Sequence, residues 1–173
     1  MPTTYTLINS NVLSSSQASV TFSAIPADYT DLVLRISARC ADTGTYAGLK
    51  FTLNSDTSSV YSFTVLYGTG SSALSDRDSA LTSGRAKFTV DANDATANTF
   101  GNLEIYIPSY LASQNKPISA TGVTETNASA AYMGANAILW RNTAAISSIQ
   151  MSEIFGTNLL SGSSFYLYGI SNA

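Results

Sequence analysis

The stretch Leu32-Val33-Leu34-Arg35-Ile36-Ser37-Ala38-Arg39 decides the fold class of this chain. Apolar side chains occupy its even-numbered positions, and polar side chains occupy most of the odd-numbered ones. Because the side chains of a β-strand point alternately to its two faces, this spacing places one apolar face against a core. The same alternation predicts strands at residues 49–53, 61–67, 86–90 and 103–107.

Weaker alternation predicts further strands at residues 5–8, 19–22, 118–123, 135–140, 148–154 and 165–170. Turn-forming clusters such as Asp42-Thr43-Gly44 separate the strands. No segment keeps an apolar stripe of helical period over three turns, so only short helices are expected, at residues 72–81 and 108–114. Residues 68–85 are the most polar and the richest in Gly and Ser, which predicts a long loop and a candidate interaction surface.

About ten half-buried strands predict an all-β fold built as an antiparallel β-sandwich. A jelly roll is the preferred topology, and an immunoglobulin-like sandwich is the alternative. No internal repeat or clear linker divides the 173 residues. We expect residues 17–173 to form one sandwich domain. Residues 1–16 are expected to be either its first strand or an N-terminal segment that anchors the protein on a neighbour.

Charged residues are sparse, at 11% of the chain with a net charge of −3, where about 25% is typical. The eight cations form no basic stripe, so nucleic acid is not an expected partner. No apolar run is long enough to cross a membrane, and no targeting segment is recognised, which predicts synthesis in the cytoplasm. Ser and Thr supply the polarity instead, and such a surface suits close packing against other protein or binding of sugars.

The reactive side chains available are few. The chain has no histidine, which removes the usual general base, the Ser-His-Asp triad and histidine metal sites. The single cysteine, Cys40, cannot form an internal disulfide, and we expect it to be a small buried residue. Glu104, outward beside Tyr106, is the best candidate for an acid of glycoside hydrolysis, but nothing places a second acid beside it. We therefore expect a protein that is not an enzyme and has no cofactor.

Two acidic clusters could offer oxygen ligands to calcium: Asp91-Ala92-Asn93-Asp94 and Asp76-Arg77-Asp78. Neither has the spacing of the twelve-residue calcium loop. Asp and Asn in turns commonly accept hydrogen bonds from their own backbone, and this interpretation is favoured. No metal is predicted, and calcium binding by Asp91, Asn93 and Asp94 is left open.

Four aromatic residues are candidate contacts for a subunit interface or a glycan: Tyr106, Trp140, Tyr166 and Tyr168. Tyrosine offers apolar area together with a hydroxyl, which suits both kinds of partner. The alternative for Tyr166 and Tyr168 is a strand buried on both faces. The alternative for Trp140 is an anchor of the core.

Four segments, in order, carry a resemblance to a known family: residues 19–32 (SVTFSAIPADYTDL), 51–62, 139–149 (LWRNTAAISSI) and 162–170 (GSSFYLYGI). They resemble small β-sandwich structural proteins of the virions of tailed bacteriophages, especially marine and cyanobacterial ones. The resemblance spans nearly the whole chain. It includes no catalytic motif and supplies no site residues, so it bears on location more than on mechanism.

The resemblance implies a protein on the virion exterior: capsid decoration (cement), head fibre or tail component. The implied partners are further copies of the chain, with a homotrimer favoured, and the major capsid or tail protein. A host-receptor module that binds carbohydrate, on a tail or head fibre, is the second hypothesis. It predicts an exposed groove with a tyrosine or tryptophan beside Asn and Asp. An enzyme with two acids in a cleft is the third.

Overall fold

The computed structural model of the chain describes residues 4–127 and 131–171, which form twelve β-strands and no helix. The strands are β1 (Tyr5–Val12), β2 (Ser19–Phe22), β3 (Asp31–Ala38), β4 (Tyr46–Leu53), β5 (Tyr61–Gly68), β6 (Ala73–Leu81), β7 (Gly84–Asp91), β8 (Gly101–Ile107), β9 (Lys116–Thr124), β10 (Tyr132–Trp140), β11 (Ile149–Glu153) and β12 (Ser164–Ile170). Every pair of adjacent strands is antiparallel. The predicted antiparallel all-β fold is confirmed, with twelve strands in place of about ten.

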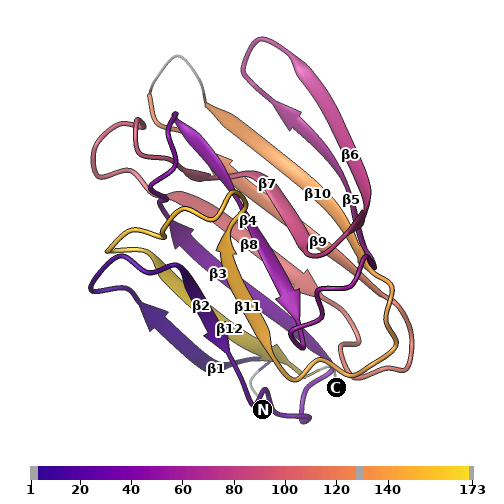
Figure 1. Ribbon diagram of the computed structural model, residues 1–173. Helices are drawn as coiled ribbons and strands as arrows, with labels where there is room; N and C mark the ends of the chain where they lie inside the picture. Colours follow the sequence, from indigo (N-terminus) through magenta and orange to yellow (C-terminus); the bar gives the residue numbers. More distant parts are fainter. Residues whose placement is uncertain (1–3, 128–130, 172–173) are drawn as a thin grey trace.

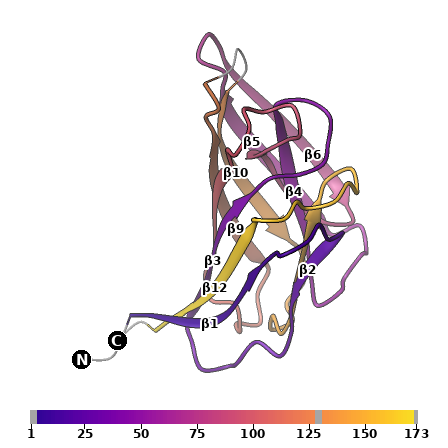
Figure 2. The same ribbon diagram turned by 90° about the vertical axis from the view of Figure 1, so that its left-hand side faces the viewer.

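The strands form two sheets that pack face to face, as the edge-on view in Figure 2 shows. The larger sheet has the order β1-β12-β3-β8-β9-β10-β5-β6, and the smaller sheet has the order β2-β11-β4-β7. The apolar positions of each alternating stretch fill the space between the sheets, where they form the core. This packing confirms the predicted β-sandwich.

Eight strands follow the course of a jelly roll. The chain alternates between the sheets, placing β1, β3, β8 and β12 in the large one and β2, β4, β7 and β11 in the small one. Two inserted strand pairs, β5–β6 and β9–β10, extend the large sheet beyond β8 (Figure 1). We call β1, β12, β3 and β8 the jelly-roll half of the large sheet, and β9, β10, β5 and β6 its extension half.

Aromatic side chains anchor the core beneath the extension half. Trp140 and Tyr61 are fully buried, and their rings stack with centroids 6.3 Å apart. The Tyr61 hydroxyl accepts a hydrogen bond from the backbone N–H of Leu53 and donates one to the carbonyl of Asp56, so its burial leaves no polar atom unpaired. Burial raises the pKa of Tyr61 to about 12.

Strand β6 overturns two predictions, the helix at residues 72–81 and the long loop at residues 68–85. It pairs with β5 from Ala73 opposite Gly68 to Leu81 opposite Tyr61. Eight of its nine residues are exposed. Because neither face of β6 is buried, the sequence of this strand needs no apolar alternation and therefore gave no strand signal.

The helix predicted at residues 108–114 is also wrong, since this segment forms turns. Ser109 has a φ of 47°, which lies outside the helical region. The buried Lys116 ammonium donates hydrogen bonds to the carbonyls of Ala112 and Gln114, both at 2.6 Å. A side chain, in place of helical hydrogen bonds, satisfies these carbonyls.

The N-terminal segment is built into the sandwich. Tyr5–Val12 forms β1 and pairs with β12 at one edge of the large sheet, as expected of a first strand. The anchoring of residues 1–16 on a neighbour stays a prediction. Among residues 4–127 and 131–171, no helix is long and apolar enough to cross a membrane.

Candidate functional site

Three of the four predicted contact residues lie on one surface, the outer face of the jelly-roll half. The register of pairing brings them together, because Tyr168 lies opposite Val33 on β3, and Val33 lies opposite Tyr106 on β8. Tyr166 is two residues from Tyr168 and shares its face. Val33 points away from the core yet is only 1% exposed. Neighbouring side chains on the outer face therefore cover Val33.

Charged groups complete this face in the adjoining row. Arg35 Nε lies 3.2 Å from Glu104 Oε2, and both side chains are more than half exposed. The Arg35 guanidinium also lies over the ring of Tyr5, 5.6 Å from its centroid. Tyr5 meets Tyr168 edge to face, with centroids 6.4 Å apart. The outer face of the jelly-roll half thus carries tyrosines that contact an ion pair, in which Glu104 is bound by Arg35.

Tyr106 is fixed by a second carboxylate. Its hydroxyl donates a hydrogen bond to Asp31 Oδ2 at 2.9 Å. Asp31 Oδ1 accepts the backbone N–H of Ser109 at 2.7 Å, which ties the turn after β8 to β3. The hydrogen bond to the Asp31 carboxylate raises the pKa of Tyr106, because removing the phenolic proton would destroy it.

A shallow groove of about 490 Å³ runs beside these tyrosines. Its lining combines two aromatic side chains with polar ones: Phe100, Tyr166, Arg35, Ser37, Asn102, Glu104 and Ser164. An aromatic ring beside an amide, a carboxylate and hydroxyls can contact both the apolar and the hydroxyl-bearing parts of a sugar. The structure thus surrounds Tyr166 with polar partners that are distant in sequence.

The outer face of the extension half has a different chemistry. The pairing register defines its outward-pointing side chains: Ser62, Thr64, Leu66, Ala73, Ser75, Arg77, Pro117, Ser119, Thr121, Val123, Met133, Ala135, Ala137 and Leu139. Arg77 is the single charged residue among them. We call this surface the uncharged face.

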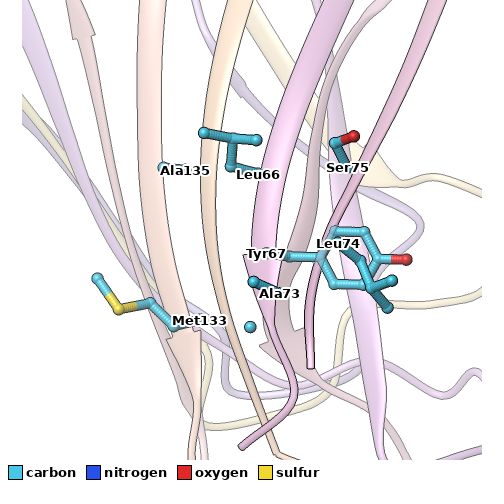
Figure 3. A pocket seen from close by; sticks show the side chains of 8 residues that line it. Leu66, Tyr67, Ala73, Leu74, Ser75, Met133 and Ala135 are labelled. Atoms are coloured by element: carbon cyan, nitrogen blue, oxygen red, sulfur yellow. The ribbon is translucent and has the colours of Figure 1, made fainter. Parts of the chain in front are cut away.

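A hollow of about 450 Å³ lies in the uncharged face where β10, β5 and β6 meet (Figure 3). Leu66, Ala73, Met133 and Ala135 contribute side chains to it. Leu66 is 65% exposed and Met133 is 59% exposed. Large apolar side chains are thus open to solvent here, in contrast to the covered Val33 of the other half.

Trp140, the fourth predicted contact residue, does not lie on the outer face of the jelly-roll half with the three tyrosines. It is fully buried beneath the extension half, which was the alternative interpretation of this residue. Its indole Nε1 donates a hydrogen bond to Asp56 Oδ2 at 2.9 Å. Hydrogen bonds from Ser58, Trp140 and Asn142 hold the pKa of Asp56 at about 2. Trp140 therefore offers no surface to a glycan in this chain.

Both acidic clusters bond to backbone N–H groups, but only Asn93 and Asp94 lie in a turn, whereas Asp76-Arg77-Asp78, which was also expected in a turn, lies within strand β6. Asp76 Oδ1 and Asp78 Oδ1 each accept the N–H of the following residue at 2.8 Å, and Asp94 Oδ2 accepts the N–H of Gly44. Asp91 is buried, and burial raises the pKa of its carboxyl. Within the described ranges, no three His, Cys, Asp or Glu residues are grouped so as to hold a metal ion.

Cys40 lies in the core, as expected. It is fully buried, and its backbone N–H bonds to the carbonyl of Asp91 at 2.8 Å. Burial raises the pKa of the Cys40 thiol far above its usual range. The thiol is therefore a packing group with little thiolate character.

A further cavity, of about 490 Å³, lies between the loop at residues 42–44, strands β4 and β7, and the turn after β11, and no sequence motif predicts it. Phe88 lines it and was expected to point into the core with Ala86 and Val90. In the structure, Phe88 has a φ of 60° within a bulge of β7. The bulge breaks the alternation, so Phe88 is half-buried and turns toward this cavity. We call this space the β4–β7 cavity.

No protein-family model matches the chain, and no curated protein matches it either. The resemblance to virion proteins therefore stays a prediction, supported by the four sequence segments alone.

Proposed function

We propose that this chain is a non-enzymatic structural protein on the exterior of a tailed-bacteriophage virion. Within the virion it acts as capsid decoration or as a head fibre, assembled as a symmetric oligomer for which a trimer is favoured. The observation that carries the assembly role is the uncharged face, with its exposed apolar hollow. The location on a virion rests on the sequence resemblance.

The uncharged face suits packing against a second copy of the same chain. Contiguous exposed apolar side chains mark interaction surfaces on soluble proteins. Identical chains that each carry a net charge of −3 repel one another, and an interface without carboxylates keeps that repulsion small. Hydroxyl and methyl groups also desolvate at much lower cost than charges. We therefore assign the self-interface to this face.

The oligomeric state tests this assignment. We expect the purified chain to be an oligomer by native mass spectrometry and multi-angle light scattering. The double variant Leu66→Asp/Met133→Asp should be monomeric, because each aspartate would be buried without a partner at the interface. Leu7→Asp, on the opposite edge of the large sheet and 50% exposed, is the matched control and should leave the oligomer intact. A monomeric wild-type chain, or an oligomer that survives the double substitution, would overturn the self-interface.

The virion location needs a separate test. Mass spectrometry of purified particles should detect the chain, and cryo-electron microscopy should place the sandwich on the outer surface. Absence of the chain from intact particles would remove the virion role, whatever its oligomeric state.

The groove beside Tyr166 favours a second candidate function, binding of a host glycan by a tail fibre or another receptor-binding module. Phe100 and Tyr166 lie there beside Asn102 and Glu104, the combination expected of a sugar site. A glycan array should then give a signal that Tyr166→Ala removes. Tyr168→Ala is the matched control, since Tyr168 lies on the same face outside the groove lining. No array signal, or a signal that Tyr166→Ala leaves intact, contradicts this function.

A further inference from the structure

We propose that the β4–β7 cavity is a binding site for an acidic saccharide, a sugar ring that carries a carboxylate. This inference concerns the isolated chain and does not depend on the virion role or on the uncharged face. The β4–β7 cavity has walls that hydrogen bonds fix before any ligand binds, aromatic rings on those walls, and an arginine whose buried Nε has no partner among the described residues.

The first wall is the bulge of β7, which a buried amide holds. Asn136 on β10 is 4% exposed, and its Oδ1 accepts the backbone N–H of Lys87 at 2.9 Å. Its Nδ2 donates to the carbonyl of Lys87 at 3.2 Å and to that of Ala120 at 3.3 Å. The amide replaces the ladder bonds that the bulge removes from Lys87. The strand therefore keeps its bulged shape, and Phe88 keeps its place.

Carboxylates hold the other two walls, which are the turn after β11 and the loop at residues 42–44. Glu153 is fully buried, and its Oε2 accepts the backbone N–H of Phe155 at 2.6 Å and that of Thr157 at 3.1 Å. Asp94 Oδ2 accepts the N–H of Gly44 at 2.8 Å, which fixes the loop at residues 42–44. Each wall of the cavity is thus preformed by a specific hydrogen bond, as binding sites for small ligands usually are.

Aromatic rings form much of the lining. Phe88 has a φ of 60°, a backbone conformation that is strained for residues other than glycine and that recurs at functional sites. Its ring stacks on Tyr67 at 4.0 Å and lies 5.3 Å from Tyr46, which also lines the cavity. Phe155 lines the cavity too, although it is 80% exposed. The open ring of Phe155 can provide a flat apolar surface for the C–H face of a sugar ring, whereas Phe88 and Tyr46 also pack against Tyr132 and leave less ring surface free.

Two cationic side chains in the lining favour a negatively charged ligand. Arg85 and Lys87, two of only eight cations in the chain, line the cavity. Lys87 is paired with Asp76, whereas Arg85 has a buried Nε without a hydrogen-bond partner in the part of the chain that the structure describes. The carboxylate of Asp42, at the loop, accepts the N–H of Thr43 at 2.9 Å.

A ligand carboxylate would satisfy the unused arginine donor. A buried donor left unpaired is unfavourable, and a guanidinium binds a carboxylate through two parallel hydrogen bonds. The Thr43 hydroxyl, the loop backbone and the Asp42 carboxylate can bond to sugar hydroxyls. The cavity thus combines an aromatic surface, one anion-binding donor and groups that bind hydroxyls, which together match an acidic sugar better than a neutral sugar or a bare anion.

Isothermal titration calorimetry on the full chain tests the proposal with four probes: sialyllactose, trigalacturonate, lactose and inorganic phosphate. We expect at least one of the two acidic saccharides to bind about tenfold more tightly than lactose or phosphate. Binding of neither acidic saccharide would overturn the proposal. Phosphate binding as tight as that of the saccharides would also overturn it, by showing a site for anions alone.

Three variants locate the binding. Arg85→Gln should weaken the acidic saccharide about tenfold or more, and Phe155→Ala should weaken it several-fold. Arg77→Gln is the matched control, because this arginine is exposed on β6 and does not line the cavity. Phe155 is so exposed that its truncation should leave the thermal unfolding midpoint unchanged, which separates loss of binding from loss of folding. Wild-type affinity in Arg85→Gln, or equal losses in Arg77→Gln, would contradict the assignment.

Discussion

The two halves of the large sheet share one continuous set of hydrogen bonds but present opposite outer faces. In the jelly-roll half, tyrosines and an ion pair surround Val33, which is almost inaccessible to solvent, although Leu7 on the edge strand is half exposed. In the extension half, Leu66 and Met133 stay open although they occupy equivalent outward positions. A sheet can thus close its outer face with its own side chains or leave it for another molecule.

The two halves also differ on their inner faces, because the extension half consists of inserted strand pairs. The small sheet has only four strands, so the extension half reaches past the area that the small sheet can cover. Strand β7 reaches under β9, β10 and β5, whereas β6 is exposed on both faces along most of its length and meets β7 through the Asp76–Lys87 ion pair. The jelly-roll half is therefore a complete sandwich, and the extension half is a sandwich only in part.

The largest loss of stability is expected for substitutions in the core beneath the large sheet, where the two halves should not differ. Trp140→Ala under the extension half and Phe165→Ala under the jelly-roll half should each lower the free energy of unfolding by about 3–5 kcal/mol, because both side chains are fully buried. Urea unfolding followed by far-ultraviolet circular dichroism measures both, since Trp140→Ala removes the single tryptophan. A loss below about 1 kcal/mol for Trp140→Ala would show that the extension half lacks a true core.

The outer faces should respond very differently to a charge. Val33→Asp should destabilise the monomer by about 2–4 kcal/mol, because it buries a carboxylate among tyrosines. Leu66→Asp should change the stability of the monomer by less than about 0.5 kcal/mol, since its side chain is solvated. Thermal unfolding at concentrations low enough to dissociate any oligomer makes the comparison. Equal losses would mean that the two faces are equally closed.

The hydrogen bond between Tyr106 and Asp31 is a smaller contribution of the jelly-roll half. Tyr106→Phe should cost about 1 kcal/mol at neutral pH. The folded-state pKa of Tyr106 is raised above its unfolded value, so this stabilisation is complete below pH 10 and is lost as the pH rises through the folded pKa. The difference between wild-type and Tyr106→Phe stability should therefore shrink at high pH. A difference that grows above pH 10 would contradict the assigned hydrogen bond.

The smallest effect is expected at the ion pair on the same face. A double-mutant cycle with Arg35→Gln and Glu104→Gln should give a coupling of about 0.5 kcal/mol or less, because the side chains are 58% and 51% exposed. The coupling should fall further in high salt. A coupling above about 2 kcal/mol would mean that the pair is shielded from water, as in an interface.

Sequence reasoning was most reliable where a strand has one buried face. Stretches such as residues 32–39 and 103–107 alternate because the core removes one set of side chains from water. Strand β6 carries no such signal, which is why a helix and a loop were predicted there. The bulge at Phe88 was equally hidden, because the amide that supports it comes from Asn136, far along the chain.

The candidate surfaces depended still more on tertiary structure. Tyr166 and Tyr168 could be placed on one face of one strand, but their closeness to Tyr106 follows from the register of β12, β3 and β8. Trp140 could equally have been a contact or a core residue, and burial decided between them. The β4–β7 cavity collects residues from three separate segments, none of which forms a motif.

By itself, then, the sequence determined that this protein is an antiparallel sandwich, short of charge and without histidine chemistry. Those properties follow from composition and from the period-two pattern, which each strand records locally. The tertiary structure alone decided which outer face is closed, which is open, and where an arginine donor has no partner among the described residues. All three features depend on which strands become neighbours. Pairing between distant segments cannot be predicted from the local sequence of the residues that it brings together.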